Sequence, residues 1–209
     1  MREGLLILLV VLVVHGLVRA FVVQVYAIPS GSMEPLLEPG DRVVVRVGDR
    51  EPRRGDVVVF DGRGVFVFGD DPPPARAAAE QLAGWLGLPL GDHHVVKRVV
   101  GVAGERVTCC GDDGRLRVDG EPLDEPYLYP GDAPSTTRFD IEVPDGALWV
   151  LGDHRSESAD SRAHLGDPRG GMVPVDQVVG RVVVVVGAGG KMSVPGSGSG
   201  SGHAGEGNP

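Results

Sequence analysis

Lysine is nearly absent from this chain, and the position of one lysine indicates a possible catalytic residue. Of the 20 basic residues, only Lys97 and Lys191 are lysines, and Lys191 lies in a glycine-rich stretch near the end. Lys97 stands within the apolar run VVKRVVGV. Arginine keeps its proton in proteins, whereas burial among valines can lower the pKa of a lysine from about 10.4 to about 7. Lys97 is therefore a candidate general base, although a lysine that extends from a strand into solvent fits the same pattern.

A base of this kind needs a nucleophile, and the stretch IPSGSMEPLLEPGD offers Ser30 and Ser32 in a turn rich in proline and glycine. A third stretch, LGDHRSESADSR at residues 151–162, concentrates polar side chains. They are Asp153, His154, Arg155, Ser158, Asp160, Ser161 and Arg162. This density predicts a hydrogen-bonded network that orients catalytic groups, with a solvated polar loop as the plain alternative.

Histidines allow two other kinds of site, which involve His93, His94, His154 and His164. A Ser-His-Asp triad is one, but no serine lies in the GxSxG context that often surrounds such a nucleophile. A metal site is the other, but the histidines lack the HExxH spacing. Both are minor alternatives to a Ser/Lys pair.

Short valine-rich runs predict the strands that must position these residues. They cover residues 21–28, 42–47, 56–60, 95–102, 116–118, 147–151 and 178–186, and turn signals such as PG, RRGD and PDG separate them. The fold class expected is mainly β, as a coiled sheet or barrel. Residues 71–90 interrupt the pattern with ARAAAEQLAGWLG, which predicts a short helix in an insertion. From residue 188 to 209, glycine and serine repeats predict a flexible tail.

The N-terminal segment is strongly apolar: residues 4–14 read GLLILLVVLVV, and the stretch extends to about Val23. Twenty residues in a helix span about 30 Å, the thickness of a bilayer core. Residues 1–24 are expected to form a cytoplasmic stub and a single transmembrane helix in the cytoplasmic membrane, with residues 25–187 as an extracytoplasmic domain. A cleavable signal cut after Ala20 or Ala27 is the other interpretation. Both place the domain outside the cytoplasm.

The net charge and the cysteine content lead to two further expectations, one about nucleic acid and one about disulfides. The net charge of -9 would repel phosphate backbones, so nucleic acid is excluded as a partner. The two cysteines are adjacent, Cys109 and Cys110. Neighbouring Cα atoms lie about 3.8 Å apart across a trans peptide, below the range of about 4.4 to 6.8 Å in relaxed disulfides. Two free thiols are therefore expected, with a strained disulfide between the neighbouring cysteines as the alternative.

Taken together and in order, four segments resemble those of the bacterial type I signal peptidases. After the apolar segment come IPSGSMEPLL, GDVVVF at residues 55–60, KRVVGVAGE at 97–105 and LGDHRSESADSR at 151–162. The resemblance covers roughly residues 5–186. It implies a coiled, largely antiparallel β-fold and a serine endopeptidase that needs no cofactor and no metal. The substrates it implies are signal peptides of exported preproteins, cut after Ala-x-Ala-like sequences next to membrane lipid.

The resemblance also assigns roles. Ser32 is implied as the nucleophile and Lys97 as the general base. The Ser30 hydroxyl is implied in an oxyanion hole beside the Ser32 backbone N–H, and Ser158 as the residue that hydrogen-bonds and orients Lys97.

The last segment carries further supporting residues by the same resemblance. Asp160 and Arg162 are implied as an ion pair. Asp153 and Arg155 match the Gly-Asp-x-Arg part of the family pattern, with His154 where many members have asparagine. We expect that replacement to be tolerated.

Two rival functions remain. One is another Ser/Lys protease of the same fold, such as a self-cleaving repressor, but those carry a basic helix-turn-helix where this chain has its apolar segment. The other is an inactive, membrane-tethered β-domain that binds exported proteins.

Overall fold

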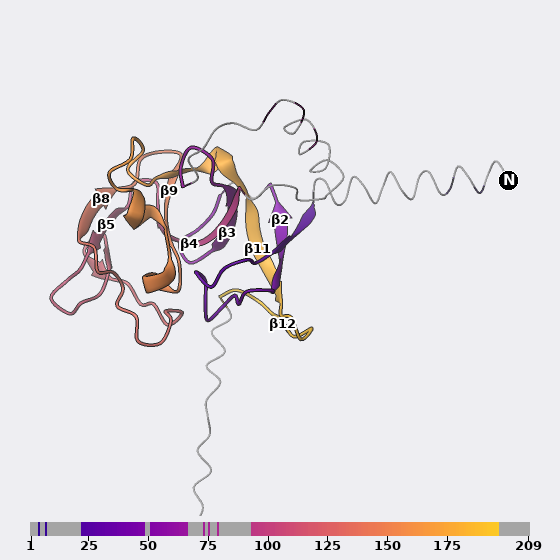
Figure 1. Ribbon diagram of the computed structural model, residues 1–209. Helices are drawn as coiled ribbons and strands as arrows, with labels where there is room; N and C mark the ends of the chain where they lie inside the picture. Colours follow the sequence, from indigo (N-terminus) through magenta and orange to yellow (C-terminus); the bar gives the residue numbers. More distant parts are fainter. Residues whose placement is uncertain are drawn as a thin grey trace, which may run out of the picture.

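The computed structural model describes residues 22–48, 51–66 and 93–196, together with the isolated positions 4, 7, 73, 75 and 79. In residues 22–48, 51–66 and 93–196 the regular elements are β-strands and short 3-10 helices, and Figure 1 shows the strands curling around one another. The strands are β1 (Val23–Ala27), β2 (Arg42–Val47), β3 (Val57–Asp61), β4 (His94–Val102), β5 (Arg106–Cys109), β6 (Arg117–Val118), β7 (Glu121–Pro122), β8 (Phe139–Glu142), β9 (Ala147–Leu151), β10 (Val173–Pro174), β11 (Val178–Val186) and β12 (Met192–Ser193). The 3-10 helices are η1 (Arg155–Glu157), η2 (Ser161–His164) and η3 (Val175–Gln177). The expected fold class, mainly β, is confirmed.

The larger sheet has the strand order β1-β2-β11-β3-β4-β9-β10, with β12 paired to β11, and its pairings are antiparallel. The register shifts at residues 178–180 and 182–184 of β11 and at residues 99–101 of β4. Such bulges bend a strand and increase its twist. The sheet therefore curls, and β1 at its edge comes to face the first half of β4 across a cleft.

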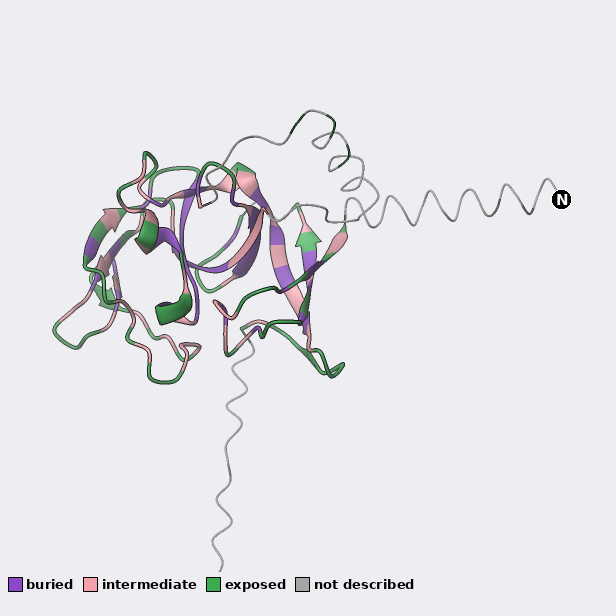
Figure 2. Cartoon of the chain, in the orientation of Figure 1, coloured by how far each residue is buried: buried purple, intermediate pink, exposed green. Residues whose placement is uncertain are grey.

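Valine drives this arrangement because its β-branched side chain packs well on a pleated surface. In β2 every second residue points inward, and Val43 and Val45 are fully buried. The strands β3 and β9 are buried along almost their whole length, as Figure 2 shows, because other segments cover both of their faces. One core cluster joins β2 and β3 to Met33 and Leu37, which follow Ser32 in the chain. The turn that carries Ser32 is thus anchored in the core.

A smaller sheet, in the order β7-β6-β5-β8, packs its apolar residues around Trp149 of β9. Beside it, the expectation of two free thiols was wrong: Cys109 and Cys110 form a disulfide. The peptide bond between them is cis, so their Cα atoms lie 2.9 Å apart instead of the spacing of a trans peptide.

The ends of the chain differ in part from the expectation. Of the predicted transmembrane segment, residues 1–21 lie outside the described residues apart from positions 4 and 7, and Val23 and Gln24 belong to β1. Within the described residues, no helix has the length and apolar character needed to cross a bilayer. The predicted helix at 71–90 also lies outside the described residues, apart from positions 73, 75 and 79.

The segment after residue 187 begins with ordered structure. Gly187 N donates a hydrogen bond to Lys191 O at 2.8 Å, and the turn that this closes brings β12 back alongside β11. The folded part therefore continues beyond residue 187, and residues 197–209 lie outside the described residues.

Candidate active site

Ser32 and Lys97 meet in space although 65 residues separate them in the chain. The Lys97 Nζ atom lies 2.8 Å from the Ser32 Oγ atom, within hydrogen-bond distance. Lys97 stands on β4 and Ser32 in the turn after β1. This separation suits a nucleophile and a base that exchange a proton directly.

The turn around Ser32 is fixed from several sides. Leu37 N donates to Met33 O at 2.9 Å, and the Met33 and Leu37 side chains are fully buried. From the opposite side, His154 N donates to Ser32 O at 3.2 Å. The backbone of the nucleophile is therefore held both by the core and by the loop that follows β9.

Lys97 is buried, with only 4% of its surface exposed. Burial lowers its pKa to about 8, because the charged amine loses its hydration. The nearby Asp160 and Asp153 carboxylates oppose this by favouring the charged form, while Arg162 favours the neutral form. At pH 7 about one tenth of such amines are neutral and able to accept a proton.

A cleft of about 150 Å³ opens beside the pair. Residues 26–30 line it from the end of β1, residues 94–97 line it from β4, and Ser32 and Met33 complete the lining. Ser30 is exposed and belongs to this lining, so the structure brings it together with Ser32 and Lys97.

The expected ion pair between Asp160 and Arg162 is present. Arg162 donates to both carboxylate oxygens of Asp160 at 2.8 Å, and Gly152 N donates to Asp160 Oδ2 at 3.0 Å. Burial alone would raise the pKa of Asp160, but these bonds outweigh it and lower the pKa. Asp160 therefore remains a buried anion close to Lys97.

Ser158 departs from the expectation. Its Oγ atom is buried, and among the described residues no hydrogen bond joins it to Lys97, so the expected bond is not formed. The hydroxyl is directed instead towards Gly152, where an added Cβ would lie 2.3 Å from Ser158 Oγ and 2.5 Å from Ser32 O. It also lies near enough to Asp160 to help lower the pKa of that carboxyl. Only glycine fits at position 152 in this packing.

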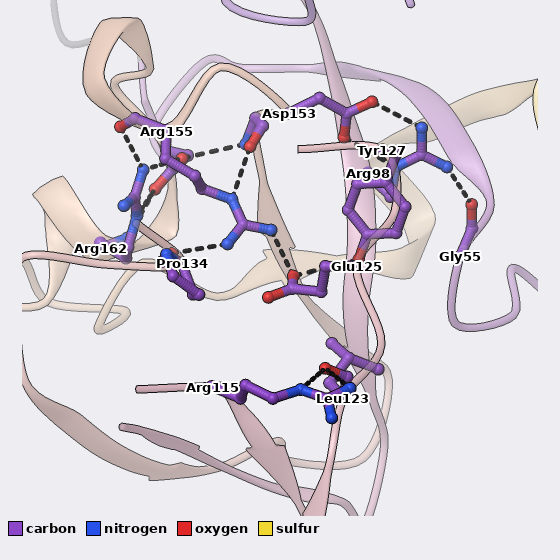
Figure 3. Close-up of polar contacts among 12 residues, drawn as sticks. Gly55, Arg98, Arg115, Leu123, Glu125, Tyr127, Pro134, Asp153, Arg155 and Arg162 are labelled. Carbon is purple, nitrogen blue, oxygen red and sulfur yellow. Dashed lines mark hydrogen bonds and ion pairs between the residues drawn. The ribbon is translucent and has the colours of Figure 1, made fainter. Parts of the chain in front are cut away.

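Asp153 pairs with Arg98, the residue after Lys97 on β4. Arg98 Nε and Nη2 donate to the two Asp153 oxygens at 2.7 and 2.6 Å, and Arg98 Nη1 donates to Gly55 O at 2.8 Å. Figure 3 shows this guanidinium beside the Tyr127 ring, whose centroid lies 4.0 Å from Arg98 Cζ. Successive side chains of a strand point to opposite faces, so Lys97 faces the cleft while Arg98 secures the loop behind it.

Arg155 is a buried cation of the loop that follows β9. It donates to Gly152 O at 2.8 Å, to Pro134 O at 2.6 Å and to Glu125 Oε1 at 2.5 Å (Figure 3). The side chains of Arg155 and Glu125 are 2% and 3% exposed, so the pair is shielded from solvent. Charge-assisted bonds of this kind hold a loop in a defined geometry.

His154 makes contacts of its own. Its ring stacks on Tyr129 with centroids 3.8 Å apart, and its Nδ1 atom lies 3.3 Å from Gly31 O and 3.9 Å from Glu34 Oε2. The ring therefore lies against the turn that carries Ser32.

Most of the chain matches a known family. The family model described as signal peptidase, peptidase S26, matches residues 1–187. This chain belongs to that family.

Relatives within the signal peptidase family cover most of the chain. The signal peptidase I of Mycobacterium tuberculosis is 35% identical, with 89% of this chain and 72% of that protein matched. The probable signal peptidase I of Mycobacterium leprae is 36% identical, with 79% and 69% matched. A crystal structure of a signal peptidase I from Enterococcus faecalis gives a TM-score of 0.40 at 24% identity, over 63% of this chain and 97% of that one.

Three residues of this signal peptidase site were missed by the sequence analysis: Arg98, Glu125 and Tyr127. Arg98 could have been found, because it is a second charge in the apolar run that contains Lys97. Glu125 lies 30 residues before Arg155, and no local sequence pattern links the two residues, so only the fold shows the pair.

The histidines considered for a catalytic triad lie elsewhere or make other contacts. His164 Nδ1 pairs with Asp167 Oδ2 at 2.7 Å, and its ring stacks on Phe66. His94 lines the cleft and packs on the Tyr26 ring at 4.9 Å. In this member of the signal peptidase family the side chain bonded to the Ser32 hydroxyl is Lys97.

Proposed function

We propose that this chain removes signal peptides from exported preproteins through a Ser32 acyl-enzyme, with Lys97 as the general base. The observation that carries the proposal is the 2.8 Å hydrogen bond between Lys97 Nζ and Ser32 Oγ at the side of an open cleft. Membership of the signal peptidase family supports the reaction class and the substrate class.

Acylation begins with the neutral form of Lys97. Its amine takes the proton from Ser32 Oγ as the oxygen attacks the scissile carbonyl carbon. The negative charge that develops on the carbonyl oxygen would be met by the Ser32 N–H and the Ser30 hydroxyl. As the C–N bond breaks, Lys97 gives the proton to the leaving amine of the mature protein, and the signal peptide stays on Ser32 as an ester.

Deacylation reverses the proton transfers. A water molecule attacks the ester while Lys97 Nζ takes its proton, and the same proton returns to Ser32 Oγ as the signal peptide leaves as a carboxylic acid. The buried anion of Asp160 stabilises the transient charge on Lys97 in both steps.

The cleft suits an extended peptide. Within the described strands, β1 pairs along one edge only, with β2, and residues 94–97 of β4 pair along one edge only, with β3. A substrate segment can therefore add as a strand between them and hydrogen-bond through its backbone. The small volume of the cleft, about 150 Å³, favours small side chains near the cut, as in Ala-x-Ala-like sequences.

The segment before β1, residues 1–21, is proposed to hold the chain in the cytoplasmic membrane as a single pass, with the catalytic domain on the outer side in contact with membrane lipid. The apolar sequence of residues 4–14 supports this, because it suits a bilayer core. Ser32 follows this segment closely, so the site would lie near the membrane surface, where signal-peptide cleavage sites emerge.

The proposal is tested by incubating the purified chain with a preprotein that carries an Ala-x-Ala site and determining the product masses. Cleavage after the second alanine is expected for the wild type and for Ser193→Ala, which alters an exposed serine of β12. Folded Ser32→Ala should be inactive. A wild-type chain that binds the preprotein without cutting it would instead support the inactive binding domain.

A further inference from the structure

The segment after β7 makes a series of contacts with the loop that follows β9. Its residues Glu125, Tyr127 and Tyr129 stand at alternate positions, and each meets a residue of the catalytic site. Glu125 bonds to Arg155, Tyr127 lies under Arg98, and Tyr129 stacks on His154, as given above. Tyr129 N also donates to Asp153 O at 3.0 Å.

Glu125 is the charged member of the series, and it is buried. Its carboxylate accepts from Arg155 Nη2 at 2.5 Å and from the Tyr127 hydroxyl at 3.1 Å, both at Oε1. Burial, followed by the charge of Glu125, raises the pKa of Tyr127, so the phenol keeps the proton that it donates. The side chains of Arg155, Glu125 and Tyr127 form one hydrogen-bonded group behind the catalytic loop (Figure 3).

This group is connected to the nucleophile through Arg155 and Gly152. Arg155 Nε donates to Gly152 O at 2.8 Å, which fixes the peptide plane after that residue. Gly152 itself is packed so closely on the Ser32 carbonyl that an added Cβ would lie 2.5 Å from Ser32 O. A shift of Arg155 would therefore move the surface on which Ser32 rests.

We propose that Glu125 is a positioning residue for the Ser32/Lys97 pair, acting through Arg155 and Gly152, with Tyr127 holding the Glu125 carboxylate in place. The inference rests on the proposed function, since it assigns Glu125 a part in the same reaction. Glu125 does not line the cleft, whose walls are formed by residues 26–30 and 94–97. Its loss should therefore lower the catalytic rate and leave peptide binding intact.

The test compares kcat and KM of four proteins on a short Ala-x-Ala peptide: wild type, Glu125→Gln, Tyr127→Phe and Asp124→Asn. The last is a matched control, because Asp124 loses the same charge one residue away while its side chain is 90% exposed. We expect kcat to fall at least tenfold in Glu125→Gln and about twofold to fivefold in Tyr127→Phe, by analogy with other supporting residues around catalytic groups. KM should stay within about twofold of the wild type in both, and Asp124→Asn should match the wild type.

Folding of each variant is checked by circular dichroism and thermal unfolding at the assay temperature. A folded Glu125→Gln protein with the kcat of Asp124→Asn overturns the proposal, as does a loss that appears only in KM. If Glu125→Gln does not fold, Tyr127→Phe decides, because it removes a single hydroxyl: an unchanged kcat overturns the proposal. A wild-type protein without activity contradicts the proposed function itself, and so the two failures are distinguishable.

Discussion

Cleavage by this chain should depend on pH through the protonation of Lys97. Burial lowers the pKa of Lys97 to about 8, and only the neutral amine can take the Ser32 proton. The neutral fraction is about 1% at pH 6, about 10% at pH 7 and about half at pH 8. We therefore expect kcat/KM to rise about tenfold from pH 6 to 7, about fivefold from pH 7 to 8, and to level off above pH 9.

Two variants test the direction in which neighbouring charges shift the pKa of Lys97. Asp160 raises the pKa of Lys97 and Arg162 lowers it. Folded Asp160→Asn should therefore move the acidic limb of the kcat/KM profile to lower pH, and folded Arg162→Gln should move it to higher pH.

The assay follows cleavage of an Ala-x-Ala peptide that has no titratable side chain, from pH 6 to 10 at constant ionic strength. The acidic limb of the kcat/KM profile then reports the pKa of the essential base in the free enzyme. A flat profile over this range, or shifts of the two variants in the same direction, would refute the assignment of this limb to Lys97.

Three further predictions concern stability, packing and the N-terminal segment. Because folding lowers the pKa of Lys97 from 10.5 to about 8, the folded state binds fewer protons between these values, and the free energy of unfolding should rise with pH there by up to about 3 kcal/mol. Lys97→Met should abolish that rise in thermal unfolding measured from pH 7 to 10.5; an unchanged rise contradicts the burial argument. Gly152→Ala should lower kcat by more than tenfold, because its Cβ would lie 2.5 Å from Ser32 O, while Gly189→Ala, with open space around it, should match the wild type. Deletion of residues 1–21 should reduce cleavage of membrane-inserted preproteins more than cleavage of short peptides, and equal losses would argue against an anchoring role.

The strands that could be predicted are those in which valine dominates. The runs at residues 42–47, 147–151 and 178–186 match β2, β9 and β11, because burial and β-branching act together there. The strands β5 and β8 were missed, since RVTC and FDIE are short and mix charged with apolar residues. Their strand conformation comes from pairing with each other, which no local pattern shows.

The residues of the candidate site also fall into those that the sequence could predict and those that it could not. Ser32, Lys97 and the Asp160–Arg162 pair could be predicted, because they stand in segments whose residue types and order are distinctive. The partners of Asp153 and Arg155 could not, because those contacts depend on how distant segments pack. The Ser158 contact was predicted wrongly: the direction of a hydroxyl depends on the close packing at Gly152.

The central claim is that Lys97 activates Ser32, and the chain offers an unusually clean control because it has only two lysines. The measurement is the rate of cleavage of an Ala-x-Ala preprotein by Lys97→Met, Ser32→Ala and Lys191→Met, with folding of each verified by circular dichroism. Lys191 is exposed in the turn before β12. The account predicts that Lys97→Met and Ser32→Ala lose activity by several orders of magnitude while Lys191→Met retains it. A folded Lys97→Met protein that still cleaves at a rate near that of Lys191→Met would contradict the account.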